Sequence, residues 1–117
     1  MTVAYDKTDV DGIIPALIEN RRGGIARLCE SYGVRELALF GSILRSDFDP
    51  ATSDVDAAVK FGPPTSHSLA RQYFDFKLAL ERLLSRSVDL VELEAMPDTR
   101  LKRIIEHTKM PIYAAAA

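Results

Sequence analysis

The sequence predicts an α+β domain, in which a small mixed β-sheet is backed by helices on one face. Three short runs rich in Val, Leu and Phe predict strands over residues 34–40, 55–61 and 88–93. Longer segments with apolar residues at helical spacing surround them and give the order α-α-β-β-α-β-α, with a weak final strand. This order of elements is typical of the α+β class.

The N-terminal part predicts two short helices, over residues 13–20 and about 25–32. The pair Gly23–Gly24 stands between them and is expected to break or weaken helical structure, because Gly is a poor helix former. Gly33 suits the left-handed position that ends a helix.

A turn and a loop separate the first two strands. The strand over 34–40 leads into Gly41–Ser42, and one helical turn is expected over 43–46. Residues 47–53 have loop composition throughout, since Asp, Pro, Thr and Ser dominate there. The second strand, over 55–61, ends at a Gly-Pro-Pro sequence.

The second half predicts a long helix, the third strand and a last helix. Apolar residues at three- and four-residue steps indicate a helix that begins after Ser66 or Ser68 and ends near Ser85. A last helix is expected from about Asp98 to His107, and residues 111–113 suit an edge strand because they begin with Pro. The last helix is expected to turn three apolar residues inward: Leu101, Ile104 and Ile105.

Length and charge limit the class of protein. The chain has 117 residues and neither a repeat nor a linker, so we expect one domain over 1–117 with loose ends at 1–8 and 114–117. The 47% apolar content is enough for a single core. The net charge of −2 argues against direct nucleic-acid binding, which needs clustered Lys and Arg.

The single cysteine, Cys29, excludes an internal disulfide and a cysteine-based zinc site. Neither a signal-peptide core nor a run long enough for a membrane span is present, so we expect a cytoplasmic protein without membrane contact. Cys29 belongs to a helical pattern of apolar residues with Ile25, Leu28 and Tyr32, which predicts a small core residue.

Two aspartates, Asp54 and Asp56, stand one residue apart at the start of the second strand. Because successive strand side chains alternate, both point to one face, opposite Val55, Ala57 and Val59. Two adjacent carboxylates repel unless a cation or protons neutralise them, and hard oxygen ligands suit Mg²⁺ that is shared with substrate phosphates. The pair therefore favours nucleotide chemistry, although an acidic pair can also decorate a solvated strand end.

Two further features strengthen this interpretation. A strand that ends at Gly41–Ser42 lets the backbone approach a ligand closely, and such a turn can bind phosphate, although it can also be a plain connection. Asp89 is embedded in a strand-like apolar run, where a charge needs a partner or a role unless it simply faces solvent.

Together these residues resemble the DNA-polymerase-β-like nucleotidyltransferase superfamily. The matching pattern is Gly41-Ser42-x-x-Arg45, Ser53-Asp54-x-Asp56 and Asp89 within Val-Asp-Leu-Val. In size the chain looks like the minimal nucleotidyltransferase (MNT) group, which implies a palm-like nucleotidyltransferase fold. The family usually has Ala-Arg-Gly where this chain has Leu44-Arg45-Ser46, and bulkier aliphatic residues in place of Ala57–Ala58.

The resemblance implies the chemistry of the site. Two Mg²⁺ ions are expected on Asp54, Asp56 and Asp89, which are also the expected catalytic residues. ATP is the expected substrate, with nucleotide contacts from Gly41, Ser42, Arg45 and Ser53. For Arg45 the residues leave two roles open, a phosphate contact or a structural ion pair with a nearby acid.

The resemblance also implies a partner. Minimal nucleotidyltransferases of this size are often antitoxins of HEPN-domain ribonuclease toxins, and some transfer AMP to a tyrosine of the toxin. Two alternatives stay open: a non-catalytic antitoxin that neutralises its partner by contact, and a nucleotidyltransferase subunit that modifies a small molecule.

Overall fold

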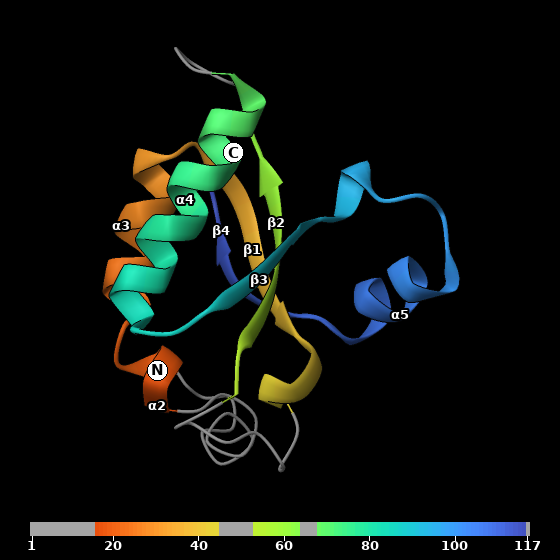
Figure 1. The fold of residues 1–117 in the computed structure, drawn as a ribbon, viewed down its shortest axis with the longest axis horizontal. Coiled ribbons are helices and arrows are strands. Elements are labelled where there is room, and N and C mark those ends of the chain that lie inside the picture. The colour runs from red at the N-terminus through yellow and green to blue at the C-terminus, as the bar shows by residue number, and fades with distance from the viewer. Residues whose placement is uncertain (1–15, 45–52, 64–67, 117) are drawn as a thin grey trace.

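The computed structural model describes residues 16–44, 53–63 and 68–116 and contains one four-stranded sheet, in the order β3-β2-β1-β4 (Figure 1). Short 3₁₀ turns, η1 and η2, follow two of the strands. The elements are α2 (Ala16–Glu19), α3 (Arg22–Ser31), β1 (Val34–Phe40), η1 (Gly41–Leu44), β2 (Val55–Phe61), α4 (Leu69–Leu84), β3 (Val88–Glu92), η2 (Leu93–Ala95), α5 (Arg100–Thr108) and β4 (Met110–Ala114).

The sheet is mixed, which confirms the predicted α+β class. β1 runs antiparallel to both β2 and β4, whereas β2 and β3 are parallel. The first two strands have the bounds that the sequence predicted, and the third ends one residue earlier, at Glu92. Because of these directions, the C-terminal end of β1 lies at the same edge of the sheet as the N-terminal ends of β2 and β3.

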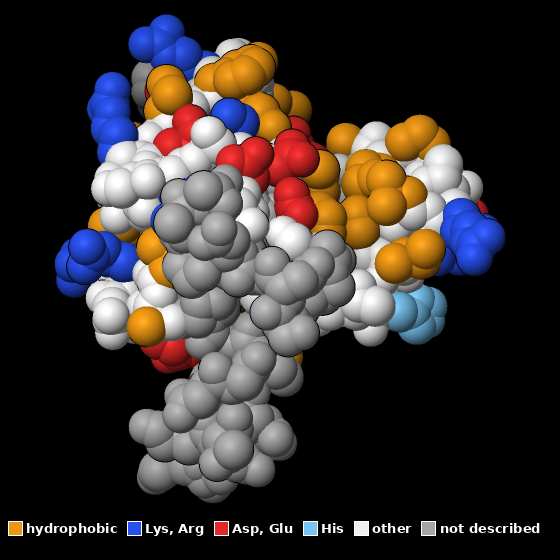
Figure 2. Space-filling view, turned by 60° about the horizontal axis from the view of Figure 1, so that its bottom comes forward, with side chains coloured by type: hydrophobic (Ala, Val, Ile, Leu, Met, Phe, Trp, Pro, Cys, Tyr) orange, Lys and Arg blue, Asp and Glu red, His pale blue; other side chains and the backbone are white. Residues whose placement is uncertain are grey.

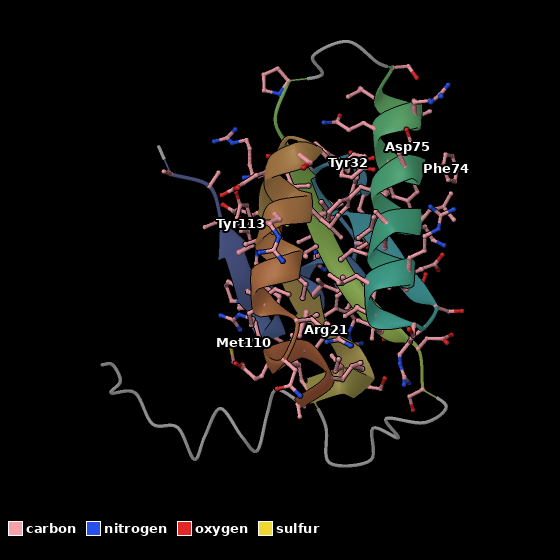
Figure 3. The ribbon with its side chains drawn as sticks, turned by 90° about the vertical axis from the view of Figure 1, so that its left-hand side faces the viewer. Arg21, Tyr32, Phe74, Asp75, Met110 and Tyr113 are labelled. Atoms are coloured by element: carbon pink, nitrogen blue, oxygen red, sulfur yellow. The ribbon has the colours of Figure 1, made fainter. Side chains whose placement is uncertain are left out.

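Helices α3 and α4 lie side by side on one face of the sheet and form the main core with it (Figure 3). Val55, Ala57 and Val59 of β2 belong to this core, which confirms the strand face predicted for them. Phe76 of α4 is fully buried there, and its ring centroid lies 6.0 Å from that of Tyr32 at the end of α3. These contacts fix the sheet against a rigid two-helix layer.

Helix α5 lies on the opposite face of the sheet, so the prediction that all helices back one face was wrong (Figure 1). Ile105 packs with Ala58 of β2 and Leu93 of η2 in a second, smaller core. Only Ile105 of the three residues predicted to point inward is buried; Leu101 is 57% exposed and Ile104 is 48% exposed. An apolar helical stripe does not specify which sheet face it meets or how much of it is covered.

One predicted helix signal is confirmed and another is wrong. Ser68 caps α4 by accepting a hydrogen bond from the Arg71 backbone N–H, as its position predicted. Gly23–Gly24, in contrast, lie within α3 and do not break it. A Cβ on Gly24 would come within 3.0 Å of the Leu83 side chain, so this glycine allows α3 and α4 to approach closely. No helix among the described residues has the length and apolarity that crossing a bilayer requires.

The C-terminal edge strand extends further than predicted. Ala114 pairs with Glu36 of β1, and the backbone N–H of Ala115 donates to the Arg35 carbonyl at 2.8 Å. The sequence placed both alanines in a loose tail, but pairing with β1 holds them against the sheet. The leader expected over residues 1–8 lies outside the described residues.

Cys29 is expected to be inert towards thiol reagents in the folded protein. Its side chain is fully buried, and burial, with a smaller contribution from Glu30, raises the thiol pKa to about 12. Because the thiolate is the reactive form, modification should follow the rate of unfolding. Fast labelling by a disulfide reagent in native buffer, at the rate seen in denaturant, would contradict the buried position.

Candidate functional site

Three acidic side chains lie at one edge of the sheet. Asp56 is directly opposite Phe40 of β1 on one side and Asp89 of β3 on the other, so these residues form a row across three strands. Directly opposite side chains share a face, and here it is the face that α5 partly covers. Asp54 adds a third carboxylate just before β2 begins. Figure 2 looks towards this end of the sheet and shows acidic side chains gathered beside an apolar area.

The turn after β1 passes directly against Asp56 in the row of Phe40, Asp56 and Asp89, which we call the acidic row. Gly41 has φ +75°, a conformation that residues with side chains rarely adopt. A Cβ at this position would overlap the Oδ2 atom of Asp56. Ser42 follows in η1 and is half-buried. The absence of a side chain at Gly41 thus brings the backbone of the turn against the carboxylate of Asp56.

The donor set at this edge fits a hard divalent cation. Asp54 and Asp89 are exposed and Asp56 is half-buried, so carboxylate oxygens are accessible from solvent. Among residues 16–44, 53–63 and 68–116, no three His, Cys, Asp or Glu side chains are gathered into a metal-binding group. Carboxylate oxygens are nevertheless the kind of ligand that Mg²⁺ prefers, and this ion usually completes its coordination with water and substrate phosphates.

The predicted site residues that the structure describes all lie at this edge. Arg45 lies outside the described residues, so its two possible roles stay open. Lys60 shares the face of Asp56 but stands further along β2, where it pairs with Glu94 at 3.3 Å. The residues brought together are Gly41, Ser42, Ser53, Asp54, Asp56 and Asp89.

Arg86, which was not among the predicted site residues, holds the segment that carries Asp54. Its Nη1 atom donates to the Ser53 carbonyl oxygen at 2.8 Å. Next to it, the Val55 backbone N–H donates to the Ser87 carbonyl at 3.1 Å. The connection between α4 and β3 thus holds the start of β2 in place through two hydrogen bonds. Residues this far apart in the chain leave no local signal of such a contact.

Glu81 holds the segment that carries Asp89. Its carboxylate accepts from the Val88 backbone N–H at 2.9 Å and from Lys77 Nζ at 3.0 Å. The hydrogen bond from Val88 is the largest cause, and that from Lys77 the next largest, that keeps the pKa of Glu81 below its ordinary value. Glu81 and Arg86 together therefore fix the acid-bearing starts of β2 and β3 relative to one another.

Tyr73 of α4 supports β3 from the core side. Its hydroxyl donates a hydrogen bond to the Leu90 carbonyl oxygen, next to Asp89 in the chain. Burial raises the pKa of Tyr73, and the charge of Asp89 acts in the same direction, against the opposite effect of Lys77. The phenol therefore stays protonated and remains a hydrogen-bond donor at neutral pH.

Replacing Glu81 with Gln is expected to remove a pH-dependent contribution to stability of about 1 kcal/mol. The folded-state pKa is depressed, so the contribution is present above the unfolded value near 4.3 and is lost as pH falls through the lower folded pKa. Denaturant unfolding of both proteins between about pH 3 and 7 measures the difference. A constant difference across this range would contradict the assignment.

The chain belongs to the nucleotidyltransferase domain family. The family model matches residues 22–110, a region that contains every described site residue. Among curated proteins, none gives a significant match.

Solved structures with the same fold include minimal nucleotidyltransferases and toxin–antitoxin complexes. One described as a minimal nucleotidyltransferase is 27% identical, with a TM-score of 0.63, over 85% of this chain and 96% of that one. A toxin–antitoxin with AMP-PNP is 24% identical, with a TM-score of 0.60, over 80% and 73%. The MNT antitoxin complexed with a tri-AMPylated HEPN toxin of Shewanella oneidensis is 20% identical, with a TM-score of 0.57, over 83% and 72%. The last two identities show likeness of fold alone.

Proposed function

We propose that this domain is a Mg²⁺-dependent antitoxin that transfers AMP from ATP to a tyrosine hydroxyl of a HEPN ribonuclease toxin. One observation carries the nucleotide chemistry: Asp56 and Asp89 lie side by side on adjacent strands, and the backbone of Gly41 passes directly against Asp56. At this edge the phosphates of the nucleotide would lie next to the carboxylate oxygens that hold Mg²⁺ for the transfer.

The turn and the loop before β2 bind the triphosphate. The missing side chain at Gly41 lets the turn lie directly against the Asp56 carboxylate. Beside it, we assign to the Ser42 hydroxyl a hydrogen bond to the phosphate oxygens. We assign Ser53 and Arg45 to the same phosphates. These contacts orient the α-phosphorus for in-line attack, and positioning of this kind supplies much of the catalysis in phosphoryl and nucleotidyl transfer.

Asp54, Asp56 and Asp89 would hold two Mg²⁺ ions, which, when bound, neutralise charge that develops on the attacking and leaving oxygens. Asp89 lies at the opposite end of the row from Phe40, and we assign it to the acceptor hydroxyl. It takes up the hydroxyl proton as the acceptor oxygen bonds to the α-phosphorus. The bond to the bridging oxygen breaks, and pyrophosphate leaves with the electron pair.

The protein acceptor is supported by similarity to relatives that form toxin–antitoxin complexes. The similar folds include an antitoxin in complex with an AMPylated HEPN toxin. By this likeness, we assign the acceptor hydroxyl to a partner protein.

Transfer of label from ATP to the partner tests the proposal. The full chain is incubated with Mg²⁺, ATP labelled at the α-phosphate and the HEPN protein encoded beside it. The control protein carries Asp54→Asn and Asp56→Asn together. Label on a tyrosine of the partner, absent with the control protein, is the expected result.

Two other results would point to different functions. A tight complex without label, with the toxin neutralised equally well by the double variant, would indicate a binding antitoxin that acts by contact. Label in a small molecule and none in protein would indicate a small-molecule-modifying subunit. Either result overturns protein AMPylation.

A further inference from the structure

The outer face of α4 leaves two large apolar side chains uncovered. Phe74 is 58% exposed, and Leu78, about one helical turn further on, is 50% exposed. Both lie on the side of the helix opposite the core residues Phe76 and Leu80. Figure 3 shows Phe74 projecting from α4 away from the sheet. Two such side chains on one exposed helix face make this face a candidate contact surface.

A shallow hollow lies on the same side of the molecule, at the C-terminal end of α4. Its volume is about 240 Å³, which leaves room for one aromatic side chain. The lining residues are Leu78, Glu81, Arg82, Arg86 and Ser87. Leu78 therefore stands between a projecting aromatic ring, that of Phe74, and a hollow that a ring can enter.

The charges on this face complement a second copy of the same face. Asp75 lies about one turn before Leu78 and Arg82 about one turn after it. Asp75 pairs with Arg71 at 3.4 Å, and its side chain is still 41% exposed. A two-fold axis beside Leu78 exchanges positions that lie equally far from Leu78 on two antiparallel helices. Asp75 of each copy then lies beside Arg82 of the other.

We propose that the outer face of α4 binds a second copy of this chain, with the two α4 helices packed antiparallel around a two-fold axis beside Leu78. Phe74 of each copy enters the hollow of the other, where the Arg82 guanidinium can lie against the ring. Each copy thus offers a projection and a hollow on opposite sides of the axis, as a self-complementary interface requires.

This contact does not involve the acidic row. Asp56 and Asp89 lie on the face of the sheet that α5 partly covers, whereas α4 lies on the other face. The inference is therefore independent of the proposed nucleotidyl transfer. The contact between single helices is smaller than the roughly 1,200–2,000 Å² that stable interfaces bury, so we expect a weak dimer with a Kd of about 10–100 μM.

Sedimentation equilibrium of the full chain, from about 5 to 500 μM, measures the dimer over this range of Kd. The single variants are Phe74→Gln, Asp75→Arg and Arg82→Glu, and a double variant carries Asp75→Arg with Arg82→Glu. The double variant exchanges the two charges and so keeps them complementary across the axis. The matched control is Leu101→Gln, because Leu101 is 57% exposed on α5, on the other side of the sheet.

Each single variant on α4 is expected to raise the Kd at least about tenfold, because it removes the projecting ring or places like charges together. The double variant should return the Kd to within about threefold of that of the unchanged protein, since the two charges act as a pair. Leu101→Gln should leave the Kd unchanged.

Three results would overturn the proposal. The first is an unchanged protein that stays monomeric at the highest concentration. The second is a dimer that persists in Phe74→Gln and Arg82→Glu, which would place the interface elsewhere on the chain. The third is a monomer whose binding to the neighbouring HEPN protein is lost in Phe74→Gln, which would assign the outer face of α4 to that partner.

Discussion

Replacing Asp56 with Asn is expected to reduce the rate of nucleotidyl transfer by about 10²–10³-fold with little loss of stability. Asp56 is the central residue of the acidic row, with Phe40 on one side and Asp89 on the other. The amide of Asn keeps the shape of the side chain but removes the negative charge that a divalent cation requires. Removal of the charge also relieves repulsion between neighbouring carboxylates, so the free energy of unfolding should hardly fall.

The matched control is Asp75→Asn, which makes the same chemical change on the outer side of α4. Figure 3 shows Asp75 away from the sheet edge, and the structure pairs it with Arg71 at 3.4 Å. Transfer rates are measured over a range of Mg²⁺ concentrations, and stability by denaturant unfolding. Equal rates for Asp56→Asn and the control would remove Asp56 from the catalytic role. A rate restored fully by high Mg²⁺ would assign it to metal affinity alone.

The strands of this fold were predictable because their signals are local. Residues 34–40 and 55–61 are short apolar runs that end at glycines, and the structure reproduces both bounds. The face of β2 followed from alternation and is confirmed by the burial of Val55, Ala57 and Val59. The packing of α5 was not predictable, because its apolar stripe does not reveal which sheet face lies beneath it. Leu101 was predicted to point inward for this reason, and it is exposed.

The residues at the acidic edge were predictable as candidates, but their support was not. The Gly41 turn and the acids lie in strand-end segments, and the strand directions bring them together. Arg86 and Glu81, in contrast, act through contacts between a helix, a loop and two strands. Arg86 looks like an ordinary charged residue after a helix until its contact with the Ser53 carbonyl is seen. Such contacts depend on tertiary structure, so a local sequence pattern does not predict them.

Replacing Gly41 with Ala is expected to lower stability by about 1–2 kcal/mol, because φ +75° is unfavourable for a residue with a Cβ. It is also expected to reduce transfer by about 10²-fold. The new methyl group would overlap Oδ2 of Asp56, so the turn or the carboxylate must move, and displacements near 1 Å are costly for positioned groups. Unfolding in denaturant and single-turnover transfer measure the two effects separately.

The same substitution at Gly23 separates site geometry from a general effect of adding a methyl group. Gly23 lies in α3, and a Cβ there would meet only the end of the Arg27 side chain at 3.8 Å. Gly23→Ala should therefore raise stability by about 0.5–1 kcal/mol through helix propensity and leave transfer unchanged. If Gly41→Ala behaves like Gly23→Ala in both measurements, the close approach of the turn to Asp56 has no role in the reaction. A loss of transfer larger than the loss of stability explains would instead show that the position of Asp56, set by the missing side chain, is what the turn contributes.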